Sequence, residues 1–332
     1  MNFETLETRL TGMTGKELAA LGAGEASFRE CLAAAIGAFL TNMTKHPGGL
    51  PYTFGLLTLP VMGNTSWGDV KSARKKNKSI RFQGDRETRK VLLTYYYCPE
   101  QYRRNDGKKR VVLMSHGFNS VSTFMLRYWR NYMELGYDCV IFDQRGHKKA
   151  ADYLCTMGGR EAFDLEQIAK FLRQEYGADA IVGIQGESYG SATAYLALPD
   201  TSRYTDFTVC DCGYSNMDEL ARWIEKLLFF YPDKEVLARL IDKMSLAAGF
   251  KFSDVKPIRG VRDCPANYPL LMIHGGIDFF VPTHMTKDMY EAKEGKKQMK
   301  IYPLAFHALS QALYRKDYHD LVQGFLKDNG FD

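Results

Sequence analysis

The 332-residue chain lacks the long apolar run that a membrane-spanning helix or a secretory signal requires. Its most apolar early stretch, residues 31–40, is too short to cross a bilayer. Acidic residues, Glu4 and Glu7, stand near the start of the chain, where a signal peptide needs basic ones. We therefore expect no transmembrane segment and a cytoplasmic location.

Cysteine is sparse, and its arrangement argues against a disulfide framework or a zinc site. The chain has seven cysteines, an odd number, and no Cys-x-x-Cys pair. Cys210 and Cys212 alternate along an apparent strand, which places both on one face as small hydrophobic residues. We expect reduced thiols, no metal and no organic cofactor.

A strong excess of one charge is also missing. The formal net charge is +5, and 45% of the residues are hydrophobic, which is typical of a globular protein with a large core. One local basic run precedes a strand and contains no interleaved aromatic residues, so a solvated linker is favoured over a nucleic-acid or anionic-membrane site. Its residues are Lys71, Arg74, Lys75, Lys76 and Lys78.

From about residue 79 onwards, short apolar β-rich runs alternate with helical patterns, which indicates an α/β fold with a mainly parallel central sheet. Near-continuous hydrophobicity is expected where helices cover both faces of a sheet. Buried strands are predicted at residues 111–114, 139–142, 181–184, 207–210, 270–273 and 299–302. Helices are predicted at residues 121–133, 159–176, 188–198 and 309–325, and an antiparallel hairpin at residues 79–97.

Two segments interrupt this rhythm. Residues 1–77 are predicted to form a mostly helical or irregular extension before an α/β domain at residues 78–332. An insertion at about residues 215–265 separates two core strands that a few residues could connect. It begins with a capping-box pattern, Ser215 to Asp218, and contains two amphipathic helices. These helices are placed to form a lid, with extra packing helices as the alternative.

A Gly-x-Ser-x-Gly sequence, Gly186-Glu187-Ser188-Tyr189-Gly190, lies between the strand predicted at 181–184 and a helical stretch. Such a turn holds its serine in a sharp, strained bend above the sheet, and the flanking glycines are needed because side chains there would collide. The pentapeptide alone is a weak signal, but both flanking elements are present. We predict Ser188 as a nucleophile.

A nucleophilic serine needs a histidine to accept its proton, and the histidine needs a carboxylate to fix its tautomer. Asp278 and His307 follow the strands predicted at 270–273 and 299–302, so both lie on loops at the carboxyl edge of the sheet. We assign Asp278 as the acid and His307 as the base, with Asp211 as the alternative acid.

Other histidines are assigned lesser roles. His274 and His284 flank Asp278, and packing or hydrogen bonding is favoured for both. The sequence offers no supporting context for His46, His147 or His319.

The sequence Ser115-His116-Gly117-Phe118 follows the strand predicted at 111–114. This is where the second backbone donor for an oxyanion is expected, because two preorganised N–H groups stabilise the charge of a tetrahedral intermediate. We nominate the amides of Phe118 and Tyr189.

Together these motifs resemble the α/β-hydrolase superfamily. The similarity covers about residues 79–326 and is greatest to lid-bearing esterases, monoacylglycerol-lipase-like enzymes and serine aminopeptidase-like (S33-type) hydrolases. Members of that branch commonly carry Asp-x-Arg-Gly-x-Gly-x-Ser after the fourth strand. Here the corresponding residues, 143–150, match only in the first half, Asp143-Gln144-Arg145-Gly146.

The resemblance implies a small-molecule ester substrate, cleaved by a carboxylesterase or lipase-like enzyme through an acyl-enzyme intermediate. Aromatic residues of the insertion suggest an apolar acyl or aryl group; they are Trp223, Phe229, Phe230 and Tyr231. A serine peptidase is the nearest alternative, with Glu187, Glu219 and Glu225 as candidates to hold a substrate ammonium group. A non-catalytic binding protein is the alternative from another class. The oligomeric state stays open.

Overall fold

A mixed eight-stranded sheet forms the centre of the molecule. The computed structural model describes residues 65–84, 87–150, 153–229, 245 and 249–332. The strand order is β1-β2-β4-β3-β5-β6-β7-β8; β2 is antiparallel to both neighbours, and all pairings from β4 to β8 are parallel. The strands are β1 (Lys75–Gln83), β2 (Thr88–Tyr96), β3 (Arg110–Ser115), β4 (Asp138–Ile141), β5 (Ile181–Glu187), β6 (Phe207–Asp211), β7 (Leu270–Gly275) and β8 (Lys297–Tyr302).

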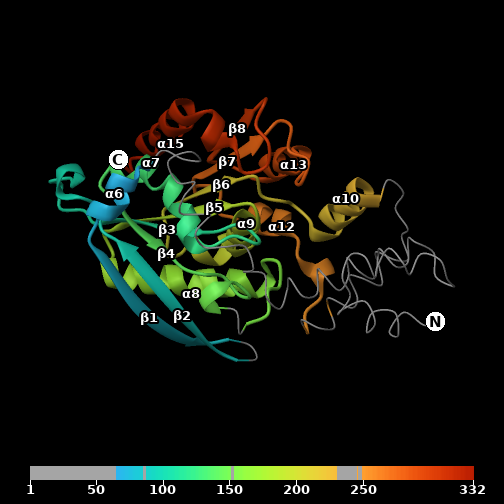
Figure 1. Ribbon diagram of the computed structural model, residues 1–332, viewed down its shortest axis with the longest axis horizontal. Coiled ribbons are helices and arrows are strands. Elements are labelled where there is room, and N and C mark those ends of the chain that lie inside the picture. Colours follow the sequence, from blue (N-terminus) through green and yellow to red (C-terminus); the bar gives the residue numbers. More distant parts are fainter. Residues whose placement is uncertain (1–64, 85–86, 151–152, 230–244, 246–248) are drawn as a thin grey trace, which may run out of the picture.

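Helices cover both faces of the sheet, giving three layers (Figure 1). One face packs against α7 (Arg130–Met133) and α15 (Arg315–Asp328), and the other against α8 (Gly159–Tyr176), α9 (Tyr189–Thr201), α12 (Pro257–Arg262) and α13 (His284–Ala292). The remaining described α-helices are α6 (Trp67–Ser72), α10 (Met217–Phe229) and α14 (Ser310–Leu313). Short 3₁₀ helices span Glu100–Tyr102, Ser122–Tyr128, Lys148–Ala150 and Phe252–Asp254.

The central strands are apolar on both sides because each side enters a different core. Along β3, Val112 and Met114 join the cluster beneath α7 and α15, whereas Val111 and Leu113 join the one beneath α8 and α9. All four side chains are fully buried. This alternation explains the unbroken hydrophobic runs from which the strands were predicted.

The six predicted core strands and the hairpin are confirmed, with ends that differ by a few residues. The helix predicted at 121–133 is instead a 3₁₀ helix followed by the short α7, because three- and four-residue spacing does not separate the two helix types. The last predicted helix is split at Tyr314 into α14 and α15.

Helix α9 continues through Pro199, whereas the sequence predicted that it would end before this residue. Proline cannot donate to the carbonyl four residues earlier, which belongs to Tyr195. Gly260 of α12 packs against that carbonyl so closely that a Cβ at position 260 would collide with its oxygen. Close packing between α9 and α12 therefore accommodates a residue that usually ends a helix.

Most of the basic run predicted as a linker belongs to the edge strand β1, so that prediction is wrong for Lys75, Lys76 and Lys78. Lysines on an exposed edge oppose pairing with a strand from another molecule. Lys78 also bonds Glu175 of α8 at 2.7 Å.

The six cysteines in the described ranges are free and buried, which includes Cys210 and Cys212, the two predicted to be buried. Within the same ranges, none of the helices combines the length and apolar character needed to cross a membrane. Of the predicted extension, residues 1–64 lie outside the described residues.

A buried carboxylate, Asp164 of α8, joins two strand ends through buried arginines. Its Oδ2 accepts hydrogen bonds from Arg89 Nε and Arg145 Nε, both at 2.9 Å, and its Oδ1 accepts one from Arg145 Nη2 at 2.8 Å. Arg145 comes from the segment that follows β4 and matches the family pattern only in its first half. The arginine of that pattern thus anchors the segment to α8.

Replacing Asp164 by Asn removes the negative charge that compensates two buried guanidinium groups. We expect a loss of about 3–5 kcal/mol in the free energy of unfolding, because a buried charge is left without its partner. Urea denaturation followed by circular dichroism measures it. The exposed pair of Asp200 and Arg203 provides the control, Asp200→Asn, which should leave the midpoint unchanged. Equal midpoints for both variants would contradict this role of Asp164.

Candidate active site

The turn between β5 and α9 holds Ser188 in a backbone conformation that side chains rarely adopt, with φ 52° and ψ −117°. A Cβ on Gly190 would collide with the carbonyl oxygen of Ser115, and one on Gly186 would lie 2.7 Å from the Cα of Ser191. The Ser188 amide donates to the carbonyl of Asp211 at 2.8 Å, which fixes the turn to the end of β6. The two glycines are therefore required by close backbone packing.

The structure brings together the three residues predicted as nucleophile, base and acid. His307 Nε2 lies 2.8 Å from Ser188 Oγ, and His307 Nδ1 lies 2.7 Å from Asp278 Oδ2. Ser188 and His307 are half-buried, whereas Asp278 is buried. A neutral imidazole can donate from Nδ1 to the carboxylate and accept from the serine at Nε2, which is the tautomer that this chemistry needs.

The loops carrying the acid and the histidine are bonded to each other. Gly276 N–H donates to the carbonyl of Tyr302 at 2.7 Å, and Ile277 N–H donates to that of Ala305 at 3.1 Å. The parallel pairing of β7 with β8 thus continues past the strand ends. This extension holds Asp278 at a fixed place relative to His307.

Asp278 is surrounded by hydrogen-bond donors. Its Oδ1 accepts the amides of Phe280 and Val281, both at 2.9 Å, and its Oδ2 lies 3.2 Å from His274 Nε2. Burial alone would raise the pKa of Asp278, but the hydrogen bonds from His274 and His307 hold it at about 2. The carboxylate is therefore ionised at neutral pH.

Asp211, the alternative acid, is buried beneath the serine turn. Its carboxylate lies 3.4 Å from the Tyr128 hydroxyl, and burial raises its pKa although Arg127 opposes the shift. Asp278, not Asp211, makes the carboxylate contact to His307.

The two histidines that flank Asp278 have the bonding roles favoured from the sequence. His274 contacts Thr286 Oγ1 at 2.6 Å and the Val281 carbonyl at 2.9 Å. His284 lies 2.6 Å from Glu219 and links α13 to α10.

Phe118 and Tyr189, nominated through their amides, lie beside the serine. Tyr189 is the first residue of α9, where backbone N–H groups have no acceptor within the helix. The ring centroids of Phe118 and Tyr189 are 6.1 Å apart, and a Cβ on Gly117 would lie 3.6 Å from Ser188 Cβ. The segment after β3 therefore contacts the serine turn directly.

Two buried histidines support that segment. His147 Nε2 accepts the Asn119 amide at 3.2 Å, while its Nδ1 lies 2.8 Å from the Arg145 carbonyl. His116 Nε2 accepts the Gln144 amide at 3.0 Å. Burial, and then the neighbouring His116, lower the pKa of His147 to about 3; burial also lowers the pKa of His116. Both rings are therefore neutral near pH 7.

A buried ion pair beneath the serine turn had no signal in the sequence. Glu187 pairs with Arg127 and accepts the Tyr128 hydroxyl at 2.7 Å. Arg127 Nη2 also donates to the carbonyl of Ala308 at 3.1 Å, next to His307. The pair joins the serine turn to the histidine loop. Glu187 could have been suspected only from its place beside the predicted nucleophile.

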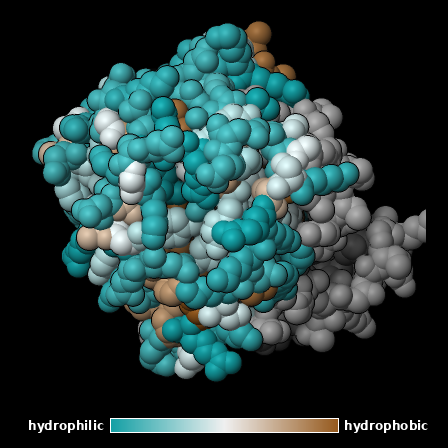
Figure 2. All heavy atoms as spheres, turned by 90° about the vertical axis from the view of Figure 1, so that its left-hand side faces the viewer, coloured by the Kyte–Doolittle hydropathy of each residue, from teal (hydrophilic) through white to brown (hydrophobic). Residues whose placement is uncertain are grey.

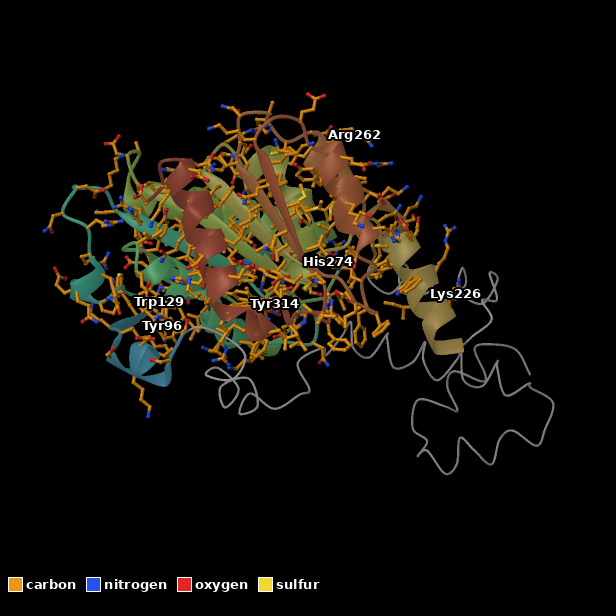
Figure 3. The ribbon with its side chains drawn as sticks, turned by 90° about the horizontal axis from the view of Figure 1, so that it is seen from above. Tyr96, Trp129, Lys226, Arg262, His274 and Tyr314 are labelled. Carbon is orange, nitrogen blue, oxygen red and sulfur yellow. The ribbon has the colours of Figure 1, made fainter. Side chains whose placement is uncertain are left out.

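Helix α10 begins the predicted insertion and lies beyond the end of β7 (Figure 3). Its first turn is capped by Asn216, whose Oδ1 accepts the Asp218 amide at 3.0 Å, so the predicted Ser215 cap is wrong. Trp223 Nε1 donates to the carbonyl of Phe279 at 2.8 Å. The side chain of Phe229 and all of Phe230 and Tyr231 lie outside the described residues.

Among the described residues, Cys212 lies close enough to Asp278 and His307 to form a possible metal-binding group with them. Ligand atoms of Cys212, Asp278 and His307 lie within 4.8 Å of one another. Burial raises the pKa of the Cys212 thiol, and the other two residues already bond each other. A metal ion here would have to displace a thiol proton and compete with that hydrogen bond.

Comparisons with known proteins agree with this architecture. A family model described as the alpha/beta hydrolase fold matches residues 110–233. The uncharacterized protein YqkD of Bacillus subtilis (strain 168) is 28% identical over 216 residues, which cover 65% of this chain and 70% of that protein.

Solved structures are similar over most of the chain. The Pyrococcus furiosus esterase PF2001 has a TM-score of 0.58 at 21% identity, and the match covers 80% of this chain and 95% of the esterase. The Pyrococcus horikoshii acylaminoacyl peptidase has a TM-score of 0.54 at 19% identity, covering 79% of this chain and 43% of the peptidase. The family match, the sheet order and these structures together show that the chain has the α/β-hydrolase fold.

Proposed function

We propose that the chain is a serine hydrolase that cleaves carboxylic esters through an acyl-enzyme intermediate. The observation that carries the proposal is the hydrogen-bonded series from Ser188 Oγ through His307 to Asp278, with contacts of 2.8 and 2.7 Å. The strained conformation of Ser188 supports it, because such strain is concentrated at functional sites.

In the proposed reaction, His307 Nε2 takes the proton of Ser188 as Oγ bonds to the ester carbonyl carbon. The carbon–oxygen bond to the alcohol then breaks, and the departing oxygen receives that proton from His307. Water enters and gives a proton to His307 as its oxygen bonds to the acyl carbon. The bond from that carbon to Ser188 Oγ then breaks, His307 returns the proton to Oγ, and the acid leaves. Asp278 stabilises the imidazolium ion in each half of the cycle.

The negative charge of each tetrahedral intermediate would be stabilised by the amides of Phe118 and Tyr189. Both are backbone groups on segments fixed by close packing, so little reorganisation is needed during the reaction. His147 and His116 hold the Phe118 segment through backbone hydrogen bonds. The proposed oxyanion hole thus depends on two neutral histidines.

Helix α10 and the rest of the insertion are proposed as a lid that contributes an apolar surface for the substrate. Trp223, the one predicted lid aromatic whose side chain is described, bonds the loop that carries Asp278. This contact connects the insertion to the acid loop.

Amide or peptide cleavage is the second candidate, favoured by the similarity to an acylaminoacyl peptidase. Two of the carboxylates suggested for holding an ammonium group have other partners. Glu187 is buried against Arg127, and Glu219 contacts His284 at 2.6 Å. The side chain of Glu225 lies outside the described residues. These contacts favour an ester over a substrate with a free amino terminus.

A fluorophosphonate probe, which reacts with activated serines, tests whether the chain is a catalyst or a non-catalytic binding protein. We expect stoichiometric labelling of the intact protein and none of Ser188→Ala, because His307 contacts and activates the Ser188 hydroxyl. Mass spectrometry of the labelled protein measures it. The control is Ser202→Ala, whose hydroxyl bonds the carbonyl of Pro199 at the far end of α9. Absent labelling of the intact protein, or equal labelling of Ser188→Ala, would refute the nucleophile.

The substrate class is tested with p-nitrophenyl esters of graded acyl length beside aminoacyl-p-nitroanilides. We expect turnover of the esters and little release from the anilides, since no unpartnered carboxylate is identified in the described part of the site for binding an amino terminus. Absorbance of the released chromophore gives kcat/KM for each compound. Turnover confined to the anilides would replace the esterase with the peptidase.

Acid should weaken the fold through His147. Its folded pKa of about 3 lies below the ordinary value of 6.5, so the unfolded chain binds a proton first as the pH falls. Stability is therefore full above about pH 6.5 and declines towards pH 3, by up to about 1.4 kcal/mol per pH unit. Urea denaturation at several pH values should show a shallower decline for His147→Gln. The exposed control His284→Gln should retain the parent slope, and an unchanged slope in His147→Gln would contradict this origin.

A further inference from the structure

In the described part of the chain, most large hydrophobic side chains that remain exposed lie on the segments that carry Asp278 and His307 or follow them. Among the described residues there are six of them, and five lie between residues 279 and 313. The sixth, Phe163, lies on α8. The face turned away from α10 is mainly hydrophilic (Figure 2). A large group of exposed apolar side chains often marks a binding site.

Three of these residues form what we call the phenylalanine rim: Phe279, Phe280 and Phe306, with 55%, 62% and 45% of their surface exposed. The rings of Phe279 and Phe306 are 6.0 Å apart, and the Phe280 ring is 5.6 Å from that of His307. The rim therefore combines residues from the acid loop and the histidine loop, and it borders the imidazole itself.

The backbone beneath the rim is fixed by the same groups that build the site. The Phe280 amide donates to Asp278 Oδ1 at 2.9 Å, and the Phe279 carbonyl accepts a bond from Trp223 of α10 at 2.8 Å. The Phe306 carbonyl accepts the Leu309 amide at 3.1 Å. Rings on fixed backbone offer a preformed apolar surface, which lowers the entropy cost of binding.

The position of the rim beside His307 indicates which half of an ester it would contact. His307 Nε2 receives the serine proton and delivers it to the departing oxygen, so the leaving group must lie against this imidazole. The carbonyl oxygen would instead point towards the amides of Phe118 and Tyr189. A group that packs on Phe280 is therefore on the alcohol side of the scissile bond.

We propose that the phenylalanine rim is a binding site for the alcohol portion of the substrate and selects esters of apolar alcohols, alkyl or aromatic. The proposal rests on the ester hydrolysis proposed above. It assigns the selectivity of the enzyme to the alcohol half of the substrate. Glu219 of α10 and His284 of α13 contact each other at 2.6 Å.

Two isomeric esters test this assignment. Hexyl acetate carries its apolar chain on the alcohol side and ethyl hexanoate carries it on the acyl side, while ethyl acetate lacks the chain. The alcohols have similar acidities, so leaving-group chemistry changes little. We expect Phe280→Ala to lower kcat/KM for hexyl acetate about tenfold more than for ethyl acetate, since an apolar contact on this scale discriminates to that extent. For ethyl hexanoate, the loss should match that for ethyl acetate.

Phe163→Ala is the matched control, because it removes an exposed phenylalanine from α8 and should change none of the three rates. A selective loss on ethyl hexanoate would assign the rim to the acyl chain and overturn the proposal. Equal losses on all three esters would mean that Phe280 only positions His307. The proposal would also be overturned if Phe280→Ala lowered kcat/KM for none of the esters. The same holds if the variant kept the ester preference and instead changed from dimer to monomer in sedimentation.

Failure of the proposed function gives a different result. In that case the parent protein hydrolyses none of the three esters and is not labelled by the fluorophosphonate. The other case is that the parent protein hydrolyses ethyl acetate, and the Phe280→Ala variant keeps the parent's ratio of kcat/KM for hexyl acetate to kcat/KM for ethyl acetate. Only the rim proposal then fails.

Discussion

The packing of the Ser188 turn against the end of β3 is the constraint on which the site depends. Gly190 lies so close to the Ser115 carbonyl that any side chain there would collide with it. The same turn is bonded to the end of β6 through the Ser188 amide. Because β3, β5 and β6 are neighbours in the sheet, these contacts place the serine, the Phe118 segment and the start of α9 together. The strained backbone of Ser188 persists because the surrounding structure holds it.

Electrostatic interactions set the protonation states of the buried side chains in the site and hold them in place. Asp278 stays ionised because four donors surround it, while His116 and His147 stay neutral because burial lowers the pKa of both imidazoles. Arg127 and Glu187 connect the serine turn to the residue after His307. The charges of Asp278 and of the Arg127–Glu187 pair thus have partners, as burial at low dielectric requires.

The sequence was sufficient to predict the strands, the Ser188 turn, and the approach of Asp278 and His307. Buried parallel strands have a strong hydrophobic signal, and residues that follow them meet at one edge of the sheet.

Other features depend on contacts between distant segments, which periodicity does not encode. His147 had no context in the sequence because its partner Asn119 and its neighbour His116 follow a different strand. The sequence predicted Arg127 only as one residue of a helix, and its ion pair with Glu187 joins two segments far apart in the chain. Helix α9 continues through Pro199 although proline usually ends a helix, and α9 packs tightly against Gly260 at this point.

The central claim is that Ser188, His307 and Asp278 act as one chemical unit. The most direct measurement is kcat/KM for one ester with Ser188→Ala, Asp278→Asn and the double variant. Groups that act as a unit lose activity non-additively, so we predict that the double variant is no slower than Ser188→Ala, within about twofold. If the two losses instead multiply in the double variant, Asp278 acts independently of the serine and the account is wrong.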